Sequence, residues 1–241
     1  MRIPVIRGLI RRRVLVNYRA DPAVVRRLLP VPFSPQLVQG HALVGVCLIR
    51  LEHVRPRGLP ALIGLASENA AHRFAVEWND AAGQTCQGVY VNRRDTDSRL
   101  NHLAGGRLFP GEHHLAAFDV ADRGNAIEIA MRSDDGAVAV QLSGETHDAW
   151  PTTSVFGSLA TASAFYERGS LGYSATCDPG RFDGLVLNTH RWHVTPLRMH
   201  DVKSSYFSDP AVFPPGSVAF DHALLAREID HEWIGTDDLR A

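Results

Sequence analysis

Lysine is almost absent from this chain. Of the 25 Lys and Arg residues among 241, only Lys203 is a lysine. An imine forms from an uncharged amine, and the arginine guanidinium stays protonated, so Lys203 is the one side chain able to act as an imine-forming nucleophile. Asp201 lies two residues away, on the same face if the segment is a strand. A carboxylate there stabilises the charged ammonium, which is not nucleophilic.

Cysteines and long apolar runs are also scarce. The three cysteines, Cys47, Cys86 and Cys177, are far apart and form no C-x-x-C pair. This pattern excludes a disulfide framework and a zinc knuckle, and it predicts reduced thiols in a cytoplasmic protein. The amino-terminal apolar run is broken by Arg7 and no small-residue cleavage site follows, so we expect neither a signal peptide nor a membrane partner.

Charge and known motifs exclude further classes. The formal net charge is −1, so no bulk field favours nucleic acid. The sequence contains no G-x-G-x-x-G, Walker loop, G-x-S-x-G or H-E-x-x-H motif. None of the 12 histidines has the spacing of a metal ligand set. We therefore expect no cofactor and no bound metal.

What remains is a globular sequence dominated by strand patterns. Hydrophobic residues make up 45% of the chain, which is enough for a core. Strands are predicted over residues 13–18, 41–54, 72–78, 86–92, 113–120, 125–132, 137–147, 184–197 and 217–229. Short helices are predicted after the capping residue Asp21, in the segment of residues 95–106 and after Ser158, the last two ending at glycines. No linker divides the chain, so we predict one α+β, β-rich domain over residues 1–241, with a large antiparallel sheet or barrel.

Several stretches, in order, resemble the acetoacetate decarboxylase superfamily, and above all its bacterial relatives of unknown function. They are "RRRVLVNYRADPAVVRRLLPVPF", "GLASENAAHRFAVEW", "GVYVNRRDTDSRLNHLAGGRLFPGEHH" and "FDHALLAREI". Together they cover the chain from about Arg11 to Trp233. The resemblance implies a β-rich domain around an internal small-molecule pocket and an oligomer, expected here to be a homo-oligomer.

The resemblance also implies site residues. In the decarboxylase, a lysine whose pKa is lowered by a second lysine forms an imine with a β-keto acid. Glu68 matches the pocket glutamate, and Arg11 matches the pocket arginine better than its neighbours do. The lysine pair is replaced by His113 and His114, and an imidazole cannot form that imine. Alternation along a strand predicts that only one of the two histidines faces the pocket.

The strand over residues 86–92 and its continuation supply further candidates. By strict alternation Tyr90, Asn92 and Arg94 lie on one face. That face is either exposed to solvent or lines the pocket, with Tyr90 and Arg94 binding the substrate and Arg94 holding a carboxylate.

Three functions stay open. The first is an enzyme that moves protons on a small oxo-acid or ketone without a Schiff base, with Glu68, His113 and His114 as catalytic residues. The second is a non-catalytic pocket for a small molecule with a carboxylate or carbonyl group. The third is a decarboxylase or other lyase that depends on Lys203.

Overall fold

A computed structural model describes residues 4–106 and 109–240. Its strands are β1 (Ile6–Ala20), β2 (Ser34–Pro35), β3 (Leu37–Val38), β4 (His41–Pro56), β5 (Leu65–Asn79), β6 (Thr85–Thr96), β7 (His113–Arg123), β8 (Ala126–Ser133), β9 (Ala139–Thr146), β10 (Leu171–Ala175), β11 (Arg181–Thr189), β12 (Thr195–Ser204) and β13 (Val218–Arg240). The helices are α1 (Pro22–Leu28), α2 (Arg99–Ala104) and α3 (Leu159–Arg168), with a 3-10 turn at Ala61–Ile63.

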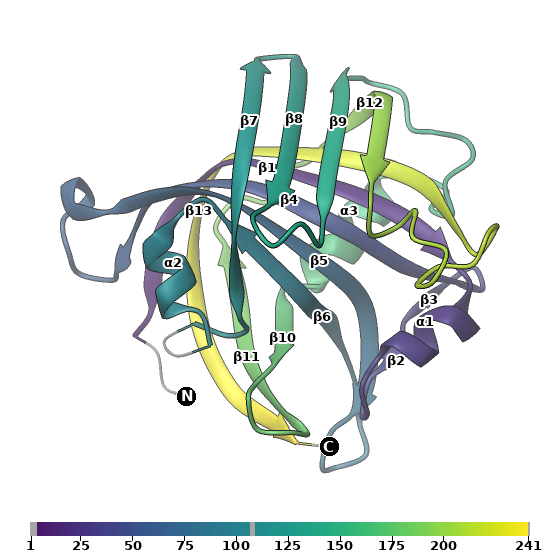
Figure 1. Ribbon diagram of the computed structural model, residues 1–241, viewed down its shortest axis with the longest axis horizontal. Coiled ribbons are helices and arrows are strands. Elements are labelled where there is room, and N and C mark those ends of the chain that lie inside the picture. The colour runs from purple at the N-terminus through teal and green to yellow at the C-terminus, as the bar shows by residue number, and fades with distance from the viewer. Residues whose placement is uncertain (1–3, 107–108, 241) are drawn as a thin grey trace.

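The strands form one thirteen-stranded, mostly antiparallel sheet that closes on itself in two places. One closed circuit of paired strands runs through β6, β5, β4, β1, β13, β11 and β10. A second circuit leaves β6 through β7, β8, β9 and β12 and returns at β13. Because the two circuits share five long strands, the molecule is not one simple barrel. Figure 1 shows β7, β8, β9 and β12 projecting to one side of the shared strands, with α3 behind them.

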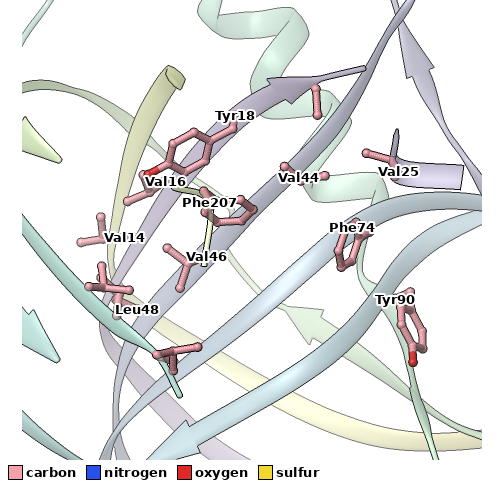
Figure 2. Packing of buried hydrophobic residues seen from close by; sticks show 14 of the residues in the cluster. Val14, Val16, Tyr18, Val25, Val44, Val46, Leu48, Phe74, Tyr90 and Phe207 are labelled. Carbon is pink, nitrogen blue, oxygen red and sulfur yellow. The ribbon is translucent and has the colours of Figure 1, made fainter. Parts of the chain in front are cut away.

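The shared strands have an apolar core on each face. We call the face toward β8 and β9 the hairpin face; Figure 2 shows its residues Val14, Val16, Val46, Leu48 and Phe74. The opposite face, which we call the helix face, packs Leu15, Cys47 and Ile49 against α3. Successive residues of a strand point to opposite faces, so each shared strand contributes to both cores. Continuous apolar stretches such as "ALVGVCLI" in β4 follow from burial on both sides.

The predicted α+β, β-rich class is confirmed, and so are the helix boundaries set by capping. Asp21 accepts a hydrogen bond from the Ala23 amide at the start of α1. Ser98 and Ser158 cap α2 and α3, which end at Gly105 and Gly169. Among the described residues, no helix is long and apolar enough to cross a bilayer.

One strand prediction was wrong, and three short strands, β2, β3 and β10, were not predicted. Residues 184–197, predicted as one strand, are divided between β11 and β12 because these strands pair with distant parts of β13. Strand β10, with the sequence "LGYSA", was missed. It is short, and its pairing with β6 and β11 brings together residues far apart in the sequence.

A β-bulge in β6 reverses its alternation. Arg73 of β5 is paired with Val91, whereas its neighbour His72 is paired with Arg93, so Asn92 is the extra residue. Tyr90 therefore shares the hairpin face with Phe74, and Arg94 faces the other way, beside Ala71.

Candidate functional site

Two adjoining chambers lie on the helix face, inside the first circuit of strands. The first chamber has a volume of about 120 Å³ and the second a volume of about 130 Å³. Both are lined by Ile49, Ala71, Arg94, Leu185 and Trp233. Because Arg94 is common to the two, it stands at their junction.

Arg94 is a half-buried cation with few partners. Its Nη2 donates to Ser174 Oγ at 3.2 Å, and its Nε has no hydrogen-bond partner. Burial lowers the pKa of Arg94 to about 10, so the guanidinium remains charged at neutral pH. A guanidinium with unused N–H donors can bind a carboxylate through two parallel hydrogen bonds.

His113 enters the first chamber from the start of β7. Parallel pairing places its Cα opposite that of Arg94. Burial, followed by the charge of Arg94, lowers the pKa of His113 to about 3, so the imidazole is neutral. Its Nδ1 lies 3.1 Å from the carbonyl oxygen of Gly111 and so carries the proton that it donates there. The lone pair is then on Nε2, which is free to accept a proton.

Two glycines make room for this arrangement. Gly111 has a φ of +76°, and a Cβ added there would lie 2.8 Å from Ser174 Cβ and 3.3 Å from Arg94 Nε. A Cβ added at Gly105 would lie 2.5 Å from His113 Nδ1. The glycine-rich segment before β7 therefore allows backbone to pass close to both polar side chains.

Three neutral polar side chains line the first chamber near its charged residues. Ser67 Oγ accepts hydrogen bonds from Asn69 Nδ2 at 2.9 Å and from Asn101 Nδ2 at 3.1 Å. Thr96 Oγ1 donates to Asn69 Oδ1 at 2.8 Å, which fixes the orientation of that amide. With both lone pairs of Ser67 Oγ engaged, its remaining capacity is to donate its own proton. A carbonyl or enolate oxygen is a suitable acceptor.

The second chamber holds two more arginines, Arg13 and Arg73. Arg13 Nε donates to Cys47 Sγ at 3.2 Å, and its guanidinium lies 5.8 Å from the centroid of the Trp192 ring. The guanidinium of Arg73 lies 5.0 Å from the centroid of the Tyr166 ring of α3.

Arg11 differs from the expectation. Its side chain is 43% exposed and pairs with Glu52 and Glu228 on the outside of the chamber wall. An irregularity in the pairing of β1 between Ile10 and Arg12 determines which of the following side chains face the chambers. Of the three consecutive arginines, Arg13 is the one that lines a chamber.

Glu68 also differs from the expectation, since it lines neither chamber. It occupies the hairpin face and accepts a hydrogen bond from Arg12 Nη2 at 2.6 Å. Burial raises the pKa of Glu68, and the Arg12 charge opposes that rise. The residues of β5 on the chamber side are its neighbours Ser67 and Asn69, as alternation along the strand requires.

His114 and Tyr90 lie away from the two chambers as well. His114 Nδ1 is 3.4 Å from Asp135 Oδ2, in a cluster with Arg93. The ring of Tyr90 packs in the core on the hairpin face (Figure 2). Its centroid lies 5.4 Å from that of the Phe33 ring. The structure thus brings Arg94 and His113 together in the first chamber, whereas Arg11, Glu68, Tyr90 and His114 line neither chamber. Arg94 and His114 do share a separate hollow, which His113 does not line.

Lys203 lies outside both chambers, in an exposed environment. Its side chain on β12 is 69% exposed, and its Nζ is 2.9 Å from Asp201 Oδ2. The pairing with Asp201 is the one that strand alternation predicts. Lys203 lines neither chamber, so no lysine amine is available beside Arg94.

Sequence reasoning missed Ser67, Asn101, Arg73 and Tyr166. For Ser67 a signal was present, because alternation along β5 puts its side chain on the opposite face of the strand from that of Glu68. Tyr166 and Asn101 come from helices that pack on the barrel, and their approach is not encoded in any local pattern. Among the described residues, no three His, Cys, Asp or Glu side chains are grouped so as to hold a metal ion.

Comparisons with solved structures identify the fold. The chain matches an acetoacetate decarboxylase-like enzyme from Sphingomonas wittichii RW1 with a TM-score of 0.63 and 12% identity, covering 100% of this chain and 94% of that one. It matches acetoacetate decarboxylase from Legionella pneumophila with a TM-score of 0.61 and 10% identity, covering 98% and 88%. The enduracididine biosynthesis enzyme MppR, complexed with pyruvate, matches with a TM-score of 0.59 and 12% identity, covering 98% and 90%.

Sequence comparison places the chain more narrowly. No protein among the curated ones matches it. Residues 9–229 match DUF2071, a family described as an uncharacterized conserved protein. The chain has the acetoacetate decarboxylase-like fold, and it belongs to the DUF2071 family.

Proposed function

We propose that this protein is an enzyme that transfers a proton at the carbon next to the carbonyl of a small oxo-acid, without a Schiff base. The observation that carries the proposal is the pair formed by Arg94 and His113 in a chamber that no lysine lines. The solved relative complexed with pyruvate, a small oxo-acid, supports this substrate class.

Each polar side chain has a role in this proposal. Arg94 binds the carboxylate of the substrate. His113 Nε2 removes a proton from the adjacent carbon, so the C–H bond breaks, an N–H bond forms and the electron pair moves onto the carbonyl oxygen. The hydroxyl of Ser67 donates a hydrogen bond to that oxygen as its negative charge develops. Return of the proton to carbon completes exchange or isomerisation with no change in oxidation state.

The low pKa of His113 is compatible with this role once substrate is bound. After burial, the charge of Arg94 is the next largest cause of the lowered pKa of His113. A substrate carboxylate paired with Arg94 offsets that charge, which raises the pKa of His113 and strengthens it as a base. In the absence of a ligand the imidazole is a weak base. This observation favours a second candidate function, the binding of an oxo-acid without turnover.

Exchange of protons for deuterons tests the proposal. The protein is incubated with pyruvate, 2-oxobutyrate and acetoacetate in D₂O, and exchange next to the carbonyl is followed by NMR above the uncatalysed rate. We expect His113→Gln to lower the rate by at least about 100-fold, the usual contribution of a general base. The matched control is His114→Gln, which changes the neighbouring imidazole outside both chambers and keeps the activity.

The outcomes separate the candidate functions. Exchange that persists in His113→Gln contradicts the proposed role of His113. Saturable binding of these acids with no exchange supports the second candidate instead. The protein is also incubated with the same acids, reduced with borohydride and weighed by mass spectrometry. A mass increase that is absent in Lys203→Ala supports a Schiff-base lyase that depends on Lys203.

A further inference from the structure

The second chamber contains positive charge for which the described residues supply no counterion. Arg13, Arg73 and Arg94 all line it, and among residues 4–106 and 109–240 none of the three forms an ion pair. The one acidic residue in its lining, Glu167, is itself exposed. Arg73 is buried and Arg13 and Arg94 are half-buried. Burying a cation without a partner is costly, so this chamber suits a ligand that brings negative charge.

The donors of these arginines are largely unused. Within the described part of the chain, each guanidinium makes one hydrogen bond: from Arg13 to Cys47, from Arg73 to Asn17 and from Arg94 to Ser174. A guanidinium has five N–H donors. The Nε atoms of Arg73 and Arg94 are buried and have no partner among the described residues. Arg73 as a whole is only 7% exposed, so water does not satisfy it freely.

A buried relay holds Arg73 in position. Asp221 Oδ2 accepts from His222 Nδ1 at 2.6 Å, so His222 Nε2 accepts from Asn17 Nδ2 at 3.1 Å. Asn17 then presents its Oδ1 to Arg73 Nη2 at 2.6 Å. Burial lowers the pKa of His222, which keeps the ring neutral and fixes this direction of donation. The charge of Asp221 is already shared with Ser154, Val155 and Arg19.

From this geometry we propose that the second chamber is a subsite for a second carboxylate. This inference rests on the function proposed above. Together the two proposals make the substrate an oxo-acid with two carboxylates joined by a short apolar linker. One carboxylate pairs with Arg94 next to His113. The other reaches Arg73 and Arg13, and the linker passes the apolar side chains shared by the chambers, such as Ile49 and Leu185.

Calorimetric titration of the full chain with two probes tests this inference. The probes are 2-oxoglutarate and 2-oxopentanoate, which have the same length and differ in one carboxylate replaced by a methyl group. We expect 2-oxoglutarate to bind at least about ten-fold more tightly, the lower end for a hydrogen-bonded charge pair. Arg73→Met should reduce the affinity for 2-oxoglutarate to that for 2-oxopentanoate and leave the latter unchanged. Arg94→Met should weaken both. The control Arg123→Met removes an exposed cation of the β7–β8 turn and should change neither.

The results distinguish this inference from the proposed function. Equal affinities of the wild-type protein for the two probes overturn the second subsite and leave the oxo-acid proposal standing. Equal losses for both probes in Arg73→Met overturn it as well. Failure of both probes to bind rejects the two proposals together. The wild-type comparison decides even if Arg73→Met does not fold.

Discussion

At the residue scale, Glu68 has a structural role in the core. It forms a buried ion pair with Arg12, whose side chain is 4% exposed. Removing one partner of a buried pair leaves the other charge unpaired, whereas replacing both with apolar residues is often neutral. The second acid near Arg12 is Asp122, at 3.9 Å, and it compensates only in part.

We predict that Glu68→Ala lowers the free energy of unfolding by about 3 kcal/mol because it isolates Arg12. Urea unfolding measures the loss. In the double variant Arg12→Met with Glu68→Leu most of the stability should return. Affinity for oxo-acids in the folded fraction should stay within about two-fold, because the Glu68 side chain lies on the face of β5 opposite the chambers. A loss of binding in a stably folded Glu68→Gln would return Glu68 to the site.

At the scale of elements, the turn before β7 fixes the position of His113. Its residue Gly111 combines a left-handed φ with a close approach to Ser174, while Gly124 in the β7–β8 turn has a φ of +78° and open space around it. The two glycines therefore differ in crowding and share the same backbone conformation.

We predict that Gly124→Ala costs about 1 kcal/mol from backbone strain alone. Gly111→Ala should cost more, because the added Cβ must displace Ser174, and it should also weaken oxo-acid binding through Arg94. Thermal unfolding and calorimetric titration give the two readouts. Equal stability losses with unchanged binding would show that crowding at Gly111 has no consequence for the site.

At the scale of the whole molecule, burial keeps several histidines neutral. The pKa is lowered to about 3 for His72 and His113 and to about 4 for His231, in each case chiefly by burial. His72 is fully buried, and both of its ring nitrogens lack hydrogen-bond partners among the described residues. The unfolded chain takes up a proton at each of these positions near pH 6.5, and the folded chain does not.

Stability should therefore fall as the pH drops from about 6.5 toward 4. Each such histidine contributes up to about 1.4 kcal/mol per pH unit, since protons bind preferentially to the unfolded state. We predict that His72→Phe, which keeps an aromatic ring against Tyr206 and Phe207, makes the free energy of unfolding depend less steeply on pH. The decrease should correspond to about one fewer proton taken up on unfolding. Urea unfolding at pH 7, 6 and 5 measures it, and the difference from the wild-type protein removes the contribution of the carboxylates, which both proteins share. An unchanged slope would mean that His72 is protonated in the fold.

The sequence by itself determined the β-rich class, the capped helices, the pairing of Asp201 with Lys203 and the lack of a lysine for an imine. Each depends on residue identity or on neighbours in the chain, such as the Ser98 cap or strand period. Only the tertiary structure decided which side chains share a chamber. The bulge at Asn92 turned Arg94 away from Tyr90, and the pairing of β6 with β7 chose His113 over His114. Arg13, Arg73 and Arg94 converge because β1, β5 and β6 belong to one closed circuit, and contacts between distant segments leave no local pattern in the sequence.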